Sequence, residues 1–266
     1  MIIEKLIIGA VAGNMIGICN NDKQIQSANT PLFSDKLNFT SDTVFTVAVM
    51  DALLNGREYT ETLQTYGRRY PDMRYGMALL RWLKQDHPQP YHSWNNGAAL
   101  RISPVGHACR TLSETLDEAR RCAEVSHNHP DGIKGAQAAA SCVFLAKNGR
   151  SREEIRSYVE SAFGYDLHRK IEDIRPRYHY DQSCESSVPE AVIAFLDSTG
   201  YEDSLRLAIS LGNSNGSLAC ITGAISHAYY KEIPHHIAVP VISRLSPEII
   251  EIIEKFSNTY PLSLFH

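Results

Sequence analysis

Apolar residues recur at helical spacing along most of the chain, and short polar turns rich in Asn, Ser, Thr and Gly separate these stretches. The sequence has no alternating apolar and polar run long enough to predict a β-strand. The pattern therefore predicts an all-α protein. Because no linker or low-complexity tract interrupts it, we expect a single compact helical domain over residues 1–266.

The first predicted helix carries a glycine at every fourth position. Residues 1–9 form an apolar run with two charges inside it, and apolar residues continue to Ile16. We expect this run to form a buried first helix, with Gly9, Gly13 and Gly17 on one edge where a second backbone can approach closely. Three asparagines lie at and beyond its expected C-terminal end: Asn14, Asn20 and Asn21.

Ser and Thr caps mark several later helix starts. A Ser or Thr followed three residues later by Glu is a capping box, and Pro is favoured in the first helical turn. The segment 164–186 is polar, aromatic and broken by Pro176, so it is predicted as a long ordered loop. The predicted starts are Thr115 with Glu118, Ser151 with Glu154, Ser187 with Pro189, and Ser246 with Pro247.

Four polar turns lead into tightly packed helices and carry the candidate chemistry. Each places hydroxyls, amides and unpaired backbone N–H groups at a helix start. If they converge, they form a polar pocket that favours a phosphate-bearing or nucleotide-like ligand. Helix capping and close packing at Gly97, Gly132 and Gly135 would explain the same residues without a ligand. The turns are 40–43, 93–97, 127–135 and 212–217.

Composition and charge narrow the class of protein. Hydrophobic residues make up 43% and charged residues 21%, as in ordinary globular domains. The formal net charge of -4 argues against a nucleic-acid partner, and no run is long enough to cross a membrane. The six cysteines are scattered without metal-binding spacing, so we expect reduced core thiols in a cytoplasmic protein.

The four turns resemble the motifs of the ADP-ribosylglycohydrolase family, all-helical hydrolases typified by dinitrogenase reductase activating glycohydrolase. The early Thr-Asp-Asp-Thr motif corresponds to residues 40–43, and the Ser-x-Gly-Asn-Gly-x-x-Met-Arg motif to 93–101. A His-containing motif corresponds to 127–136, and the last, Gly-Gly-Asp-x-Asp-Thr, to 212–217. The likeness covers nearly the whole chain in the right order. It implies an all-helical fold that binds ADP-ribose or an ADP-ribosylated protein.

The resemblance also implies a substrate-binding set. Trp94 stands where the family often has an aromatic residue, and Asn95 replaces a glycine and could crowd the pocket. The positions that match family contacts to ADP-ribose, or lie among them, are Ser93, Trp94, Asn95, Asn96, Gly97, His127 and Gly132.

The chain departs from the family at the metal-binding carboxylates. The family holds two magnesium ions with Thr and Asp residues of the first and last motifs, while an acid in the loop after the first helix assists. Here Asp42 alone remains charged. A shift of one residue in the last motif would bring Asn213 and Asn215 to the aspartate positions, which restores an oxygen but no charge. The replaced positions are Asn14, Asn20 or Asn21, Ser41, Ser214 and Gly216.

Two adjacent divalent ions facing one carboxylate would repel each other with too little compensation. We therefore predict that magnesium binding is weak or absent, with Thr40, Asp42 and Ser217 as the remaining ligands for one metal ion or a water cluster.

Three functions follow from these departures. The first is a catalytically impaired protein that binds ADP-ribose, an ADP-ribosylated protein or a protein partner. The second is an active hydrolase that works through Asp42 with one or two magnesium ions, or through other acids such as Asp131 or Glu185. The third is an interaction module or immunity partner of an ADP-ribosylating protein, with a vestigial pocket.

Overall fold

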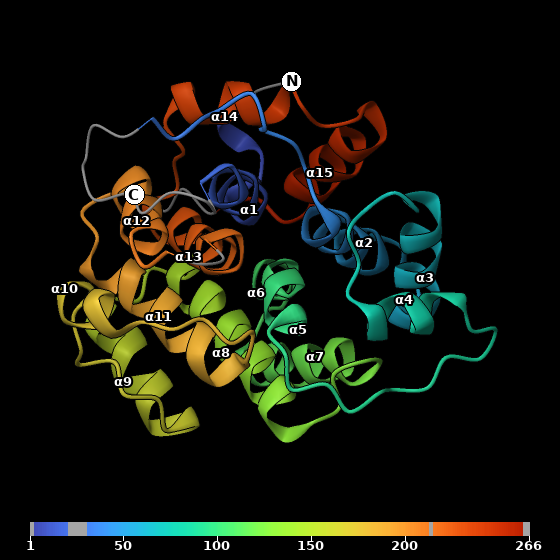
Figure 1. Ribbon diagram of the computed structural model, residues 1–266, viewed down its shortest axis with the longest axis horizontal. Helices are drawn as coiled ribbons and strands as arrows, with labels where there is room; N and C mark the ends of the chain where they lie inside the picture. Colours follow the sequence, from blue (N-terminus) through green and yellow to red (C-terminus); the bar gives the residue numbers. More distant parts are fainter. Residues whose placement is uncertain (1–2, 21–30, 213–214, 263–266) are drawn as a thin grey trace.

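Helices make up nearly all the regular structure of the computed structural model, which describes residues 3–20, 31–212 and 215–262 (Figure 1). The all-α prediction is confirmed: these residues form no β-strand, and one isolated bridge joins Asn95 to Ser183. The elements in order are η1 (Ile3–Lys5), α1 (Gly9–Cys19), α2 (Ser41–Asn55), α3 (Tyr59–Arg69), α4 (Met77–Lys84), α5 (Gly97–Arg101), α6 (Ser103–Ala108), α7 (Leu112–Glu124), α8 (Pro130–Lys147), α9 (Arg152–Phe163), α10 (Ile171–Ile174), η2 (Arg175–Arg177), α11 (Cys184–Asp197), α12 (Tyr201–Ile209), α13 (Asn215–Tyr230), α14 (His235–Ile242) and α15 (Pro247–Thr259).

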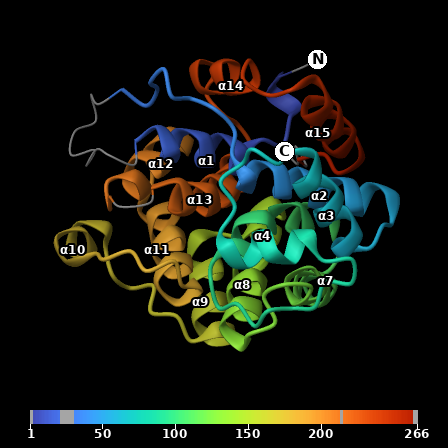
Figure 2. The same cartoon turned by 45° about the vertical axis from the view of Figure 1, so that its right-hand side comes forward.

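Helices α1 and α13 lie side by side at the centre of the fold, although more than 190 residues separate them in the chain (Figures 1 and 2). Their backbones almost touch. A Cβ atom added at Gly13 would lie 1.9 Å from the carbonyl oxygen of Ala219, and one at Gly9 would lie 2.4 Å from that of Gly223. The predicted glycine edge is therefore confirmed at Gly9 and Gly13, where no side chain fits.

The start of the first helix was predicted wrongly. Residues Ile3–Lys5 form a short 3₁₀ turn, and α1 begins only at Gly9. Leu6, Ile7 and Ile8 are buried as predicted, but outside a helix. Because α1 continues to Cys19, Asn14 lies in its middle rather than near its end, and its side chain is completely buried.

Two of the predicted caps are wrong and two are confirmed. Thr111, not Thr115, caps α7 by accepting from the N–H of Glu114, and Ser183, not Ser187, caps α11. Both errors place the cap four residues late, because Ser and Thr also occur one helical turn inside each helix. The capping box of Ser151 and Glu154 and the cap by Ser246 are present as predicted.

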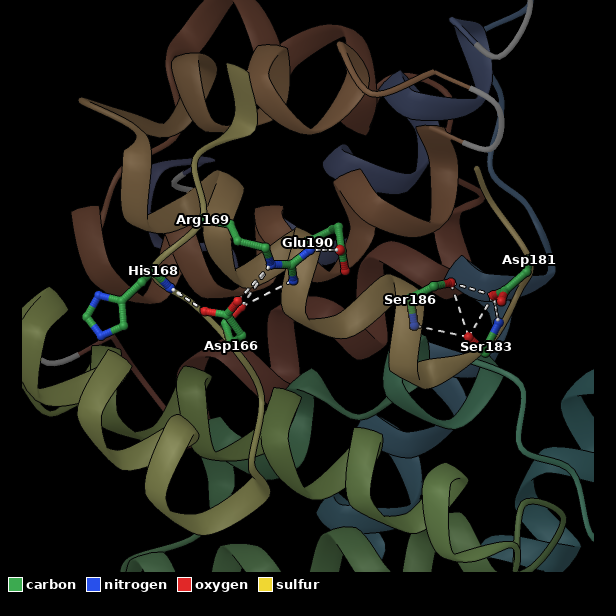
Figure 3. Close-up of polar contacts among 7 residues, drawn as sticks. All are labelled: Asp166, His168, Arg169, Asp181, Ser183, Ser186 and Glu190. Atoms are coloured by element: carbon green, nitrogen blue, oxygen red, sulfur yellow. Dashed lines mark hydrogen bonds and ion pairs between the residues drawn. The ribbon is translucent and has the colours of Figure 1, made fainter. Parts of the chain in front are cut away.

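The segment predicted as a long loop contains the short elements α10 and η2, and two polar clusters hold it in place (Figure 3). Arg169 pairs with the buried Glu190 of α11 at 2.7 Å and also bonds to Asp166. Nearer α11, the Asp181 carboxylate accepts from the backbone N–H of Ser183 at 2.8 Å and from the hydroxyls of Ser183 and Ser186. The chain from residue 170 to residue 180 is thereby held at both ends.

Helix α14 was not predicted, because Pro240 lies inside it and only eight residues form it. The core is otherwise the expected one, a continuous cluster of buried apolar side chains from all parts of the chain. All six cysteines are buried and unpaired, as predicted. In the described part of the chain, the helices are too short or too polar to cross a membrane.

Candidate functional site

A cleft of about 1030 Å³ opens where the first turns of α2 and α13 meet the loops before α5 and α11. Each of the four predicted turns contributes to its lining, with residues 40–42, residues 93–97, His127 and Ser217. The predicted convergence of these turns is therefore confirmed. The segment before α4 and Lys36 close the other side.

The first turn is tied to α1 through the amide of Asn14. Thr40 caps α2, and its Oγ1 donates to Asn14 Oδ1 at 2.6 Å. Asn14 Nδ2 in turn donates to Asp42 Oδ2 at 3.0 Å. A weaker bond from Thr43 Oγ1 reaches the same Asn14 oxygen at 3.4 Å. The buried amide therefore bridges the hydroxyl and the carboxylate that the sequence assigned to one metal site.

The carboxyl group of Asp42 is held in an environment that disfavours its charge. Asp42 lies on the cleft wall, but protein surrounds the rest of its side chain, and this burial raises its pKa to about 6. The hydrogen bond from Asn14 acts in the opposite direction and lowers it. One neutral amide donor therefore offsets only part of the cost of burying this charge.

The donor set here differs from the one that the family resemblance implies for two magnesium ions. Magnesium needs hard oxygen ligands in near-octahedral geometry. The N–H of Asn14 points at Asp42 Oδ2, an oxygen that a cation would need. No group of three or more His, Cys, Asp or Glu that could hold a metal ion occurs in the described ranges. These residues do not fit a pair of divalent ions.

The other residues that the sequence assigned to the metal site have uncharged side chains. Ser41 and Ser217 line the cleft near Asp42, and Ser217 Oγ lies 3.2 Å from the hydroxyl of Tyr180. Gly216 offers its backbone carbonyl to Asn14 Nδ2 at 3.5 Å. Asn20 is a helix C-cap whose amide bonds to the carbonyls of Ile16 and Leu32. Asn21, Asn213 and Ser214 lie outside the described residues.

The opposite wall is built by two segments that pair with each other. The backbone N–H of Asn96 donates to the carbonyl of Gln182 at 2.8 Å, and that of Cys184 donates to the carbonyl of Trp94 at 3.2 Å. The buried Asn96 side chain donates to Tyr180 Oη at 3.2 Å and to Ser187 Oγ at 2.9 Å. Asn96 therefore joins the two wall segments, and this structural role does not depend on a ligand.

Tyr180 and Gln182 line the cleft but were not singled out from the sequence. They lie in the polar, aromatic segment that was predicted only as an ordered loop. Its density of aromatic residues was the available signal. Arg74 and Lys36 also line the cleft without having been predicted.

His127 is buried and oriented by a chain of hydrogen bonds. Arg101 donates to Ser126 Oγ at 2.8 Å, and Ser126 Oγ lies 2.8 Å from His127 Nδ1. Burial, followed by the charge of Arg101, holds the pKa of His127 well below its usual value, so the ring is neutral. The ring tautomer decides which of Ser126 Oγ and His127 Nδ1 donates, and Nε2 faces Gly97 at the cleft.

The other residues assigned to the ligand differ in their positions. Trp94 lies on the cleft wall with 47% of its surface exposed, and Ser93, Asn95 and Gly97 line the same wall. Gly132 instead lies behind it: an added Cβ would come within 2.6 Å of the carbonyl oxygen of Ser93. Close packing explains Gly132 without a ligand contact.

The two acids considered as alternative catalysts lie away from the cleft. Asp131 Oδ2 lies 3.5 Å from Nδ1 of His129, which is the N-cap of α8. Glu185 pairs with Lys134 at 2.8 Å, and each acid is more than 40% exposed. Neither belongs to the lining of the cleft, so this part of the hydrolase alternative is not supported by the structure. His129 Nδ1 accepts from the backbone N–H of Asp131 at the start of α8, and among the described residues His127 has a partner at Nδ1 only, so the two rings bond to different groups.

Comparison with known proteins identifies the fold and the family. A solved structure described as an ADP-ribosylglycohydrolase-related protein complex superposes with a TM-score of 0.70 at 19% identity, covering 97% of this chain and 99% of that one. ADP-ribosylhydrolase ARH3 of Gallus gallus is 25% identical over 262 residues, which cover 74% of this chain and 71% of that protein. The Danio rerio protein of the same name is 22% identical, covering 84% and 82% of the two chains.

The family model for ADP-ribosylglycohydrolases matches residues 3–260. This match spans every helix from η1 to α15, and the resemblance inferred from the four turns is confirmed. The chain belongs to the ADP-ribosylglycohydrolase family.

Proposed function

We propose that this protein binds an ADP-ribosyl group, free or attached to a protein, and hydrolyses it slowly or not at all. The bond from the Asn14 amide to Asp42 carries the proposal. Asp42 is the one carboxylate kept from the family's metal motifs, and a hydrogen-bond donor already occupies one of its oxygens. Without further carboxylates, the site would hold magnesium weakly and activate water poorly.

Several features of the cleft support ligand binding. A volume of about 1030 Å³ can admit a nucleotide-sized molecule. Lys36 and Arg74 on its wall offer positive charge to phosphate groups. The exposed ring of Trp94 offers a flat apolar surface, and the neutral His127 presents a ring nitrogen for a hydrogen bond. The proposed ligand contains phosphates, sugars and a base that match these chemistries.

Two measurements test the proposal together. Calorimetric titration of ADP-ribose should show binding in magnesium and in EDTA alike, and incubation with an ADP-ribosylated protein should release little free ADP-ribose. A comparator with Ser41, Ser214 and Gly216 changed to Asp, combined with Ile18→Ala to make room, should bind magnesium more tightly. Equal and tight magnesium binding by the natural and the restored proteins would contradict the proposal.

An active hydrolase is the second candidate. Thr40 and Asp42 keep their positions on the cleft wall, and the curated relatives carry the name ADP-ribosylhydrolase. If the natural protein releases ADP-ribose at a rate that Asp42→Ala abolishes, this candidate replaces the first. If neither protein binds ADP-ribose, yet the chain captures one protein partner stably, the pocket is vestigial and the chain acts as an interaction module.

A further inference from the structure

We infer that the side-chain amide of Asn14 takes the place of a cation beside Asp42, and that the pair forms a metal-independent acceptor for a hydroxyl group of the ligand. This inference rests on the proposed function, because it assigns one contact of the proposed ligand. It concerns Asn14, Thr40 and Asp42, which meet where α1 passes beneath the start of α2.

The amide of Asn14 has an orientation that its neighbours determine. Its oxygen accepts from Thr40 Oγ1 at 2.6 Å, and its nitrogen donates to Asp42 Oδ2 at 3.0 Å. Turning the amide over would bring its oxygen next to the carboxylate oxygen and leave the Thr40 hydroxyl facing an N–H. The donor side of the amide therefore faces Asp42.

A divalent cation would require the opposite arrangement. Two oxygens 3.0 Å apart are held together readily by a metal ion between them, whereas here one of the two atoms is a nitrogen that carries hydrogens. A cation at Asp42 Oδ2 would face that N–H. Binding it would cost the bond to Asp42 and, if the amide turned, the 2.6 Å bond to Thr40 as well. Asn14 has no exposed surface, so it cannot exchange these partners for water.

The same arrangement leaves Asp42 with one oxygen for a ligand. Oδ2 receives the Asn14 amide, and Oδ1 has no hydrogen-bond partner among the described residues. Asp42 lines the cleft, so a ligand can reach this side of the carboxylate. A carboxylate oxygen only accepts, and the ligand group that suits it is a hydroxyl donor such as a sugar hydroxyl.

Binding measured in EDTA separates this contact from metal binding. The natural protein should bind ADP-ribose with the same Kd in EDTA and in magnesium. Asp42→Asn keeps the shape of the side chain but loses the charged acceptor, so the Kd in EDTA should rise about 10–100-fold. Asp117→Asn is the control, because Asp117 is an exposed carboxylate on α7 outside the lining of the cleft, and the Kd of this variant should stay unchanged.

The reverse substitution tests the role of the amide. Asn14→Asp places a second carboxylate against Asp42, so this variant should bind ADP-ribose poorly in EDTA and regain affinity in magnesium. Its melting temperature should also rise with magnesium, while that of the natural protein should not. This thermal comparison needs no nucleotide and shows whether each variant is folded.

The outcomes distinguish the two proposals. If ADP-ribose fails to bind every variant under all conditions, the proposed function is wrong, and the thermal comparison still decides whether Asn14 stands in place of a cation. If ADP-ribose binds but Asp42→Asn has the natural Kd in EDTA, or magnesium tightens binding to the natural protein more than about tenfold, the inference is wrong and the proposed function survives.

Discussion

Gly216 has no room for a side chain while Ile18 keeps its position. A Cβ atom added at Gly216 would lie 2.6 Å from Cδ1 and 2.7 Å from Cγ1 of Ile18, a residue that lines the cleft. An apolar side chain therefore fills the space that a side chain at this position would need.

Gly216→Asp should lower the free energy of unfolding by about 1–3 kcal/mol, because Ile18 must move to admit the new side chain. The double variant Gly216→Asp/Ile18→Ala should lose less unfolding free energy than the two single variants lose together, because Ile18→Ala removes the clash. Urea denaturation of both single variants and the double variant measures this coupling. Strictly additive losses would show that Ile18 does not exclude a side chain at Gly216.

At the scale of the helices, the contact between α1 and α13 sets the position of Asn14. The two helices approach so closely because Gly9 and Gly13 face the carbonyl oxygens of Gly223 and Ala219. This contact buries Asn14 beneath Asp42 and brings it near the first turn of α13. The stability of the helix pair and the geometry of the candidate site therefore depend on the same surface.

Gly13→Ala should be among the most destabilising single-methyl changes in the chain, costing about 3 kcal/mol or more. The new Cβ would meet the backbone oxygen of Ala219, which cannot turn aside as a side chain does. Gly200→Ala is the control, since an added Cβ there meets nothing within 4 Å and its φ of -174° is extended. Thermal melts compare the two, and equal melting temperatures would contradict the close contact.

At the scale of the whole molecule, buried ionisable groups tie stability to pH. Burial lowers the pKa values of three histidines: His227 to about 3, and His107 and His127 well below the usual value. Burial has the opposite sign at Asp42, whose pKa it raises to about 6, and it also raises the pKa of Glu190. Acidification therefore acts on these two groups of residues in opposite directions.

For a histidine with a lowered folded pKa, the unfolded chain takes up a proton below about pH 6.5 while the folded protein does not, so stability falls as the pH drops. Above pH 6.5 this loss disappears. Each such histidine should remove at most about 1.4 kcal/mol per pH unit below that point. Asp42 offsets part of the loss between its folded pKa of about 6 and its usual value of 3.8.

His227→Gln should therefore flatten the decline of stability between about pH 6.5 and pH 4, because glutamine takes up no proton. Denaturant unfolding at a series of pH values measures the slope. His87→Gln is the control, since His87 is exposed and should leave the slope as in the natural protein. An unchanged slope for His227→Gln would mean that this histidine does not contribute to the acid sensitivity.

The sequence was most informative where a local pattern has a local cause. The caps at Ser151 and Ser246 and the helical spacing around Gly9 and Gly13 each depend on residues a few positions apart. The N-cap was predicted wrongly where two Ser or Thr residues fitted the capping pattern equally well. Thr111 and Thr115 lie one turn apart, as do Ser183 and Ser187, and the structure shows that the first of each pair is the cap.

The candidate site divides in the same way. The four turns, and Asp42 as the remaining carboxylate, could be read from the chain because each turn is a contiguous motif before a helix. Tyr180 and Gln182 could not, because they reach the cleft only by pairing with residues 94–96, far away in the sequence. Close packing at Gly132 was one of the two explanations that the sequence offered, but its contact with the carbonyl of Ser93, 39 residues earlier in the chain, came only from the structure.

The sequence by itself determined the helical class and the family, and it located Asp42 among neutral polar residues, because these properties follow from residue identity and spacing. Only the tertiary structure decided how these residues meet. The packing of α1 against α13 and α2 buries the amide of Asn14 and directs its Nδ2 to Asp42 Oδ2, 3.0 Å away. The direction of a hydrogen bond between residues on different helices is set by how those helices pack, and no pattern within one stretch of chain contains it.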